Sequence, residues 1–259
     1  MKKIPIALQM YTLREECEQD FLGAFERVAK LGYHGVELAG YYDMPVEKIK
    51  QPLDNLGLQV AANHIPHTQL QTNLQQIIRD QKVLGCKYIV CSLPEAEVKN
   101  EDKLKTHTYF LNEASEVCKQ DGIILCYHNH HFELECLSNG KTALEAIIES
   151  APSDHLQTEF DIYWLKMAGE DPVEWFNRYK GRTPLVHLKD MTPDEEHYFA
   201  ELGTGGIDVE AVLNLGEEAN VQWWIVEQDE TRLNPYESIE ISMQYLKERL
   251  PYMRNNEWS

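Results

Sequence analysis

Short apolar runs alternate with longer amphipathic stretches eight times along the 259 residues of this chain. Each apolar run is typical of a strand buried on both faces, and each longer stretch repeats its apolar residues at helical spacing. The expected strands are 4–10, 35–38, 58–62, 88–92, 123–127, 156–161, 185–188 and 223–226. The expected helices are 21–31, 46–56, 70–84, 104–119, 142–150, 172–179, 209–218 and 235–249. Eight such units predict an α/β fold, a single (β/α)8 TIM barrel over residues 1–259.

The main alternative for an alternating chain is a doubly wound sheet. That fold usually carries a glycine-rich phosphate loop after its first strand. Here the first strand leads into Gln9–Arg14, which contains no glycine. The chain has no Pro-, Gly- or Ser-rich linker that would divide it into domains, and the tail after Tyr252 is expected to be a frayed end.

Charge and cysteine usage limit the function classes. The formal net charge is −19, with 43 acidic against 24 basic residues. Such a surface repels phosphate backbones and anionic membranes, which argues against nucleic-acid binding. No apolar run approaches the roughly 20 residues that span a bilayer, and no apolar signal segment opens the chain. The six cysteines form no C-x-x-C pair, so we expect a cytoplasmic protein without disulfides or structural zinc. Apolar side chains near the C-terminus would allow a homodimer.

Ionisable side chains gather where the expected strands end. The densest group is Tyr127–Glu133, which holds three histidines, an asparagine and a glutamate directly after a buried strand. Other strand ends carry Glu37, His64, Ser92, Asp161, His187, Lys189, Asp190, Glu227 and Asp229. The carboxyl ends of barrel strands converge on one face, which is where catalytic groups lie in such folds. The pattern therefore predicts an active site at that face.

Residues two apart on a strand point the same way. The pairs that share a direction are His128 with His130, Glu159 with Asp161, His187 with Lys189, and Glu227 with Asp229. Carboxylates and imidazoles that converge from several strands form a mixed oxygen and nitrogen ligand set. This set suits Mn²⁺, Mg²⁺, Co²⁺ or Zn²⁺ better than a metal that prefers thiolates. The alternative is a buried ion-pair network in which Lys189 supplies the positive charge.

Three segments at these strand ends resemble the xylose-isomerase-like TIM-barrel family: Glu159–Trp164, Val186–Asp190 and Val226–Asp229. That family includes sugar phosphate isomerases and epimerases, inosose dehydratases and endonuclease IV. Tyr127–His130 and Gly203–Asp208 look like the subgroup described broadly as sugar phosphate isomerase/epimerase. The resemblance covers essentially the whole chain. Endonuclease activity is not expected, because few of that branch's extra zinc ligands are present and the charge is unsuitable.

The resemblance implies one divalent metal, Mn²⁺ in the first place, held by Glu, Asp, His and Glu at the ends of strands five to eight. Asp161, His187 and Glu227 match the last three ligands. Family members often have Glu-Asn at the first position, where this chain has His128-Asn129. Glu133 is the preferred fourth ligand because it would keep the carboxylate-rich set, and His128 and His130 remain candidates.

The resemblance also implies an isomerase or epimerase that acts on a small sugar or polyol. In such enzymes two metal-bound glutamates move a proton next to a carbonyl through a metal-stabilised enediolate. Here Glu227 has a histidine as its partner, so the candidate catalytic residues are His128, His130, Lys189 and Glu227. An imidazole also suits elimination, which makes a lyase or dehydratase of a keto-sugar, 3-keto-glycoside or keto-inositol the alternative. A non-catalytic sugar-binding barrel is the third hypothesis.

Supporting roles follow for other residues at this face. Glu37 and His64 either bind substrate hydroxyls or are satisfied strand-end residues. Trp164 either forms a sugar-stacking wall or packs in the core. Lys189 either polarises a substrate oxygen or neutralises Asp190.

The glycine-rich segment Gly203–Gly206 precedes a helix with Asp208 as its expected N-cap. A helix N-terminus of this kind can hold a phosphate. Asp208 would repel it, so the sequence is also consistent with a non-phosphorylated sugar and leaves both kinds of substrate open.

Overall fold

The computed structural model describes residues 2–254 and confirms the expected TIM barrel. Eight parallel strands close in the order β1-β10-β7-β6-β5-β4-β3-β2. They are β1 (Ile6–Gln9), β2 (Gly35–Leu38), β3 (Gln59–His64), β4 (Tyr88–Cys91), β5 (Ile124–His128), β6 (Leu156–Asp161), β7 (Leu185–Leu188) and β10 (Trp223–Val226). No strand end differs from its expected position by more than two residues.

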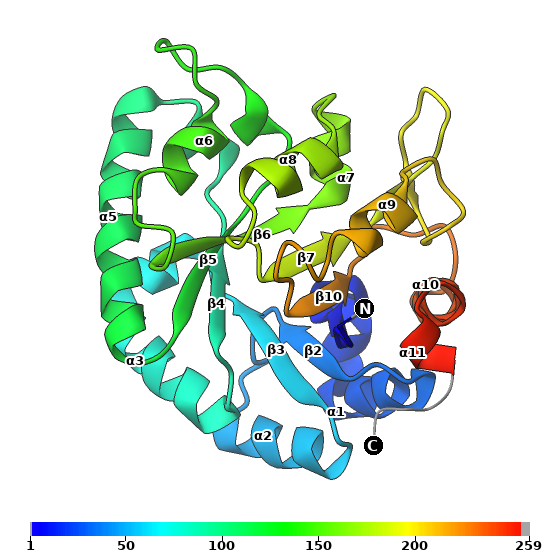
Figure 1. Cartoon of the computed structure of the whole chain (residues 1–259). Coiled ribbons are helices and arrows are strands. Elements are labelled where there is room, and N and C mark those ends of the chain that lie inside the picture. The colour runs from blue at the N-terminus through cyan, green and yellow to red at the C-terminus, as the bar shows by residue number, and fades with distance from the viewer. Residues whose placement is uncertain (1, 255–259) are drawn as a thin grey trace.

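Helices surround the strands (Figure 1). The eight expected ones are α1 (Arg14–Leu31), α2 (Val46–Asn55), α3 (His67–Leu84), α5 (Glu101–Gln120), α6 (Ala143–Ile148), α8 (Pro172–Arg178), α9 (Val209–Asn214) and α10 (Pro235–Arg249). Helix α1 begins well before the expected Phe21, because it continues through a kink at Asp20, where φ is −154° and ψ is 83°. The apolar spacing that reveals the helix starts only after that kink.

Several short elements were not expected from the sequence. They are η1 (Met10–Leu13), α4 (Glu95–Val98), η2 (Phe132–Leu134), α7 (Ile162–Met167), α11 (Pro251–Arg254) and the hairpin of β8 (Asp190–Met191) with β9 (Phe199–Ala200). Most of them follow the carboxyl ends of strands and build the rim of the barrel.

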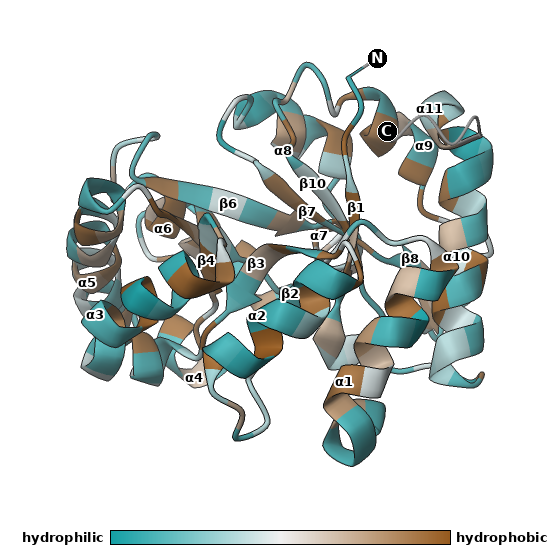
Figure 2. Ribbon diagram, turned by 90° about the horizontal axis from the view of Figure 1, so that it is seen from below, coloured by the Kyte–Doolittle hydropathy of each residue, from teal (hydrophilic) through white to brown (hydrophobic). Residues whose placement is uncertain are grey.

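The apolar core has two layers. The larger one lies between strands and helices, and it takes the outward residues of each strand, such as Ile6 and Leu8. The smaller one fills the barrel interior with the inward residues, such as Ala7 and Ile225. Figure 2 shows the corresponding pattern on the helices, whose ribbons carry both hydrophilic and hydrophobic bands. A Cβ at Gly35 would lie 3.1 Å from the Trp223 ring, so the glycine leaves room for this interior side chain.

Every second residue of a strand points into the barrel, and this alternation continues into the polar carboxyl ends of the strands. On β10, Trp223 and Ile225 belong to the interior layer, and Glu227 is the next residue of the same parity. On β7, Leu185 is interior and His187 and Lys189 follow. The barrel therefore changes from an apolar base to an ionisable upper layer along the same strands.

The C-terminal segment was expected to fray after Tyr252, but α11 continues to Arg254 and Met253 is buried. The hydroxyl of Tyr252 donates a hydrogen bond to the Ile4 carbonyl at 3.0 Å, and the side chain is buried. The rest of the expected frayed tail, 255–259, lies outside the described residues. Within residues 2–254, every helix is too short or too polar to cross a membrane.

Candidate active site

His187, at the end of β7, lies fully buried among carboxylates at the mouth of the barrel. Its Nδ1 is 2.8 Å from Glu227 Oε2, and its Nε2 is 2.9 Å from Glu37 Oε2 and 3.1 Å from Glu159 Oε2. Burial alone would lower the pKa of His187, but the carboxylates of Glu159, Glu227 and Glu37 raise it well above its ordinary value. These carboxylates therefore favour the protonated ring, and a cation bound at His187 would take the place of that proton.

Lys189 is the second buried cation of the site. Its Nζ lies 3.0 Å from Asp161 Oδ2, 2.7 Å from Glu227 Oε2 and 2.5 Å from Asp229 Oδ2. Burial opposes its charge, yet these carboxylates raise the pKa of Lys189 well above its ordinary value. Asp190 is not its partner, so the expectation that Lys189 neutralises Asp190 is wrong. Lys189 instead balances three carboxylates that face the barrel interior.

Four side chains bring donor atoms close enough to share one cation. One nitrogen or oxygen each of His128, Asp161, His187 and Glu227 lies within 4.8 Å of the others, and all four residues are buried. Asp161 Oδ1 caps α7 by accepting from the amides of the next turn. Asp161 Oδ2 is buried, and its charge is met by Lys189 Nζ at 3.0 Å. Two imidazole nitrogens and two carboxylate oxygens form a donor set that suits a first-row divalent cation such as Mn²⁺, Co²⁺ or Zn²⁺. The residues present therefore fit a metal of this kind.

Glu133, the preferred fourth ligand from the sequence, is placed elsewhere. It lies in η2, where Oε1 accepts from the Tyr127 hydroxyl at 2.9 Å and Oε2 accepts from the His130 amide at 2.8 Å. Across residues 2–254 it belongs to none of the donor groups that could hold an ion. Its carboxylate instead folds back to fix the turn after β5. We therefore replace Glu133 by His128 in the proposed ligand set.

His128 is held by Glu159, a residue whose role the sequence did not indicate. His128 Nδ1 lies 3.1 Å from Glu159 Oε2. Burial, with the charges of His187, His130 and neighbouring cations, lowers the pKa of His128 well below its ordinary value. Burial and the Glu37 charge raise the pKa of Glu159 well above its own. The lowered pKa favours the neutral imidazole, which is the form that a metal ligand or a proton acceptor requires. The only sequence signal for Glu159 was that it lies two residues before Asp161 on the same strand, so that both side chains point the same way.

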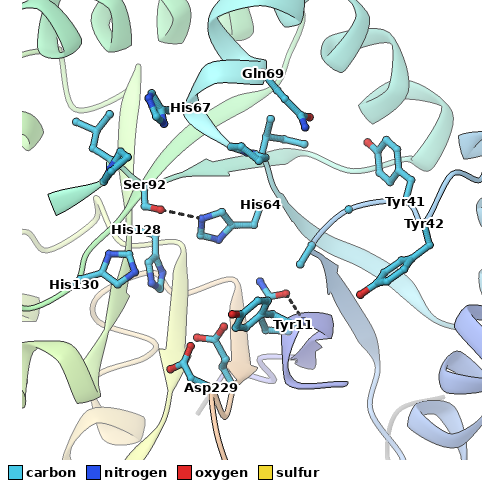
Figure 3. Close-up of a pocket in the computed structure, with 18 of the residues that line it drawn as sticks. Tyr11, Tyr41, Tyr42, His64, His67, Gln69, Ser92, His128, His130 and Asp229 are labelled. Carbon is cyan, nitrogen blue, oxygen red and sulfur yellow. Dashed lines mark hydrogen bonds between the residues drawn. The ribbon is translucent and has the colours of Figure 1, made fainter. Parts of the chain in front are cut away.

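A cavity of about 1070 Å³ opens over this cluster (Figure 3). His130, His128 and Asp229 lie toward one side of it and Tyr41 and Tyr42 lie on the opposite side. Glu227 also lines it. The described residues that line the cavity include no lysine and no arginine. The ionisable groups of the cluster therefore lie on one side of an open space.

The expected substrate-binding residues are divided by the structure. His64 lines the cavity, with Nε2 3.3 Å from Ser92 Oγ, as Figure 3 shows, and Nδ1 3.5 Å from Glu37 Oε1. Glu37 is fully buried beneath His64 and His187 and does not line the cavity. Trp164 also stays outside the lining and packs against the rings of His130 and His131. Of these three residues, only His64 is placed to contact a substrate.

The glycine-rich segment is occupied by a carboxylate of the chain itself. Asp190 accepts hydrogen bonds from the amides of Gly203, Gly205, Ile207 and Met191 at 2.8–3.1 Å. A Cβ at Gly205 would lie 2.3 Å from Asp190 Oδ1. The amides that could have bound a phosphate therefore donate their hydrogen bonds to Asp190 instead.

Comparisons with known proteins agree with this architecture. The family model described as xylose isomerase-like TIM barrel matches residues 25–249. An inosose dehydratase from Clostridium beijerinckii is 26% identical over 272 residues, which cover 90% of each chain.

Two solved structures share the fold. A sugar phosphate isomerase/epimerase from Parabacteroides distasonis has a TM-score of 0.82 and 22% identity, and the match covers 94% of this chain and 98% of that one. The IOLI protein, solved with a bound zinc atom, has a TM-score of 0.73 and 15% identity, with coverage of 96% and 99%. At these identities the structures establish the shared fold.

Proposed function

The chain belongs to the xylose isomerase-like TIM barrel family, and on this basis we propose that it is a metal-dependent lyase or dehydratase of an uncharged keto-sugar or keto-polyol. The reaction removes a proton next to a carbonyl and expels a hydroxyl or alkoxyl group from the following carbon. A divalent cation, held by His128, Asp161, His187 and Glu227, would stabilise negative charge on the carbonyl oxygen.

The observation that carries this proposal is the unlike pair of proton-transfer groups on the cavity wall. Glu227 comes from the end of β10 and His130 from the end of β5, and both line the cavity. Burial would raise the pKa of Glu227, but the adjacent Lys189 and His187 hold it well below its usual range. A carboxylate that stays ionised serves as a base, and an imidazole can donate a proton to a leaving group. Elimination needs these two different roles.

The proton transfers can be assigned to atoms. Glu227 accepts the proton from the carbon next to the carbonyl as that C–H bond breaks. A C=C bond forms, the C–O bond on the next carbon breaks, and His130 donates a proton to the departing oxygen. His130 Nδ1 is buried 3.7 Å from Glu133 Oε1, and the ring stacks on Phe132 with centroids 5.2 Å apart. The side chain is 29% exposed and lines the cavity, so the proton would leave from the exposed part of the ring.

Two observations support an uncharged substrate. Asp190 fills the glycine-rich segment, and the described lining of the cavity has no lysine or arginine to neutralise a phosphate. The carboxylates of Glu227 and Asp229 would repel a phosphate group. A cyclic keto-polyol, as named for the inosose dehydratase relative, has the required lack of charge.

Epimerisation is the second candidate. Glu227 and His130 approach the cavity from different strands, so one group could remove a proton and the other return it on the opposite face. This outcome needs no leaving group and returns the carbonyl compound with a hydrogen from solvent.

The experiment is a screen of inososes, ketoses and 3-keto-glycosides with Mn²⁺ in D₂O, followed by ultraviolet absorbance and mass spectrometry. A lyase forms an unsaturated ketone, whereas an epimerase returns a deuterated ketone and no unsaturated product. His130→Ala is expected to lose about 10²–10⁴-fold in turnover while it keeps its metal.

The matched control is His131→Ala, because His131 is adjacent, exposed and outside the cavity lining. It should keep turnover within a few-fold of the original. Full activity in His130→Ala, or purified protein that takes up no Mn²⁺, Co²⁺ or Zn²⁺, would contradict the proposal.

A further inference from the structure

The cavity is larger than one sugar ring requires. Its volume of about 1070 Å³ exceeds the roughly 300–1,000 Å³ of pockets that bury drug-sized ligands. A single polyol ring of about a dozen heavy atoms belongs at the lower end of that range. The proposed reacting groups occupy one side, around His130 and Asp229, and Figure 3 shows Tyr41 and Tyr42 across the open space. The volume therefore leaves room for a second group attached to the reacting ring.

The tyrosine side of the cavity is built by a strained turn. Tyr42 and Asp43, after β2, both have positive φ, of 47° and 59°. Left-handed backbone is unusual for a bulky residue and persists only where surrounding contacts stabilise it. The turn is held by the Met44 amide, which donates to the Tyr41 carbonyl at 2.9 Å, and by the Tyr42 ring, 4.7 Å from that of Phe21. The fold thus accepts strain to keep two adjacent tyrosines at the cavity.

The hydroxyl groups of these tyrosines are already used within the protein. The Tyr41 hydroxyl accepts from Asn63 Nδ2 at 2.7 Å, and the Tyr42 hydroxyl donates to the Arg14 carbonyl at 3.5 Å. Tyr11, from η1, is 44% exposed and has the Arg14 guanidinium 4.6 Å from its ring centroid. The hydroxyl groups of Tyr41 and Tyr42 are therefore engaged within the protein, and a ligand would meet the carbon surfaces of the tyrosine rings that line the cavity.

The neighbouring lining is largely apolar. Met44, Ile65 and Pro66 continue the surface between the tyrosines and the start of α3. Three polar side chains also lie at this end: Asp43 and Gln69 are exposed, and His67, the first residue of α3, is half-buried. A second sugar ring would need many hydrogen-bonding partners, whereas a flat apolar ring needs aromatic faces and aliphatic edges.

We propose that Tyr11, Tyr41, Tyr42 and Met44 form a second subsite that binds an aryl group linked through oxygen to the reacting sugar. This inference rests on the proposed function, because the reacting ring must lie over the Glu227 and His130 side. The substrate is then an uncharged aryl glycoside in its keto form. The subsite acts in binding, so it can be tested with glycosides that lack the keto group and do not turn over.

The test is calorimetric titration of the Mn²⁺-loaded protein with methyl β-glucoside, phenyl β-glucoside and cellobiose. Phenyl β-glucoside is expected to bind at least tenfold more tightly than the methyl compound. Tyr11→Ala combined with Tyr42→Gly should remove this preference. Glycine is chosen at position 42 because it adopts positive φ freely. The variant loses the ring and its packing on Phe21 but keeps the hydrogen bond from the Met44 amide to the Tyr41 carbonyl. Tyr11→Ala alone, at an exposed side chain, should reduce the preference without a change in stability.

The matched control is Tyr109→Ala, since Tyr109 is 65% exposed on α5 and outside the cavity lining. It should keep the full preference. Equal affinity for methyl and phenyl glucosides, a preference that survives in the double variant, or cellobiose as tight as phenyl glucoside would each overturn the subsite.

Failure of the subsite can be told apart from failure of the proposed function. If no glucoside binds but an inosose is turned over, only the subsite is overturned. If no glucoside binds and no keto-sugar or inosose is turned over, both proposals are overturned.

Discussion

A single ammonium group allows several carboxylates to share the buried mouth of this barrel. Lys189 Nζ contacts Asp161, Glu227 and Asp229 while the residue is fully buried. Removal of one partner from such a network leaves uncompensated buried charge, which costs more than the intact pair contributes. A divalent cation at the same carboxylates would supply the charge by another route. Lys189 and a metal are therefore energetically linked through Asp161 and Glu227.

Lys189→Met tests this link, because it keeps the aliphatic stem and removes the charge. In EDTA the free energy of unfolding should fall by about 3–5 kcal/mol, since the three carboxylates lose their cation. With saturating Mn²⁺ the loss should be smaller. Urea unfolding of both proteins in both conditions measures the difference.

The control is Lys82→Met, which removes an exposed ion pair with Asp121 and should cost less than about 1 kcal/mol. An equal loss for Lys189→Met in EDTA and in Mn²⁺ would contradict the link.

The positions of many site residues could be predicted at the residue scale, because two simple rules apply to them. Strand ends converge in a barrel, and inward residues alternate, which places Asp161, His187 and Glu227 together. Glu133 could not be placed this way. Its hydrogen bonds to Tyr127 and the His130 amide depend on the path of a turn that carries no periodic signal.

At the scale of elements, the loop after β7 is organised by Asp190. Its carboxylate accepts four amides of β8 and the glycine-rich segment. This explains why the segment needs glycine at position 205, where a side chain would collide with Asp190. A glycine-rich segment of the kind that often binds an anion here binds the carboxylate of Asp190 from the same chain.

Asp190→Ala should therefore destabilise the protein by about 3 kcal/mol or more, because several amides lose a charged acceptor. The control is Asp208→Ala, which removes one N-cap hydrogen bond of α9 and should cost about 1 kcal/mol. Thermal or urea unfolding of the two variants measures both losses. Similar losses in the two variants would show that the amides find other partners.

Elements with strong periodicity were predictable and short ones were not. The expected strands and long helices are present because their apolar spacing is set by burial against the barrel. Helix α7 has only six residues and starts at a cap by Asp161, a proposed metal ligand. Its existence depends on a tertiary arrangement, as does that of the β8–β9 hairpin, so local sequence patterns could not reveal either.

At the scale of the whole molecule, the barrel couples its stability to pH through contacts far from the cluster. His34, just before β2, accepts a hydrogen bond from the Ile6 amide of β1 through Nδ1 at 3.1 Å. Burial lowers the pKa of His34 to about 4. The unfolded chain binds a proton at this histidine near pH 6.5, before the folded protein does. The stabilisation from His34 is therefore complete above about pH 6.5 and is lost as the pH falls toward 4.

His34→Gln should remove this component of the pH dependence. Between pH 7 and pH 5, the free energy of unfolding of the original protein should fall by about 1–2 kcal/mol more than that of the variant. Solvent reaches part of the ring, which limits the size of this difference. Urea unfolding at the two pH values measures this difference. The exposed His131→Gln serves as control and should follow the original protein. A variant with the same pH dependence as the original would contradict the assignment.

The two sides of the cavity come from different parts of the chain. The tyrosine side comes from residues 11 and 41–44, after β1 and β2, whereas the proposed proton-transfer and metal-ligating groups come from residues 128–229. Residues between 64 and 69 and between 92 and 95 complete the lining. Residues 10–14 also hold the strand end that carries Glu227, since Thr12 Oγ1 accepts from the Gln228 amide and Arg14 donates to the Asp229 carbonyl. Mutations in residues 39–45 are therefore the ones expected to alter which molecules are accepted without moving the proposed reacting groups. A chimera that exchanges residues 39–45 with those of a relative tests this expectation. Diversification of this barrel can thus proceed in one region of the gene while the other stays fixed.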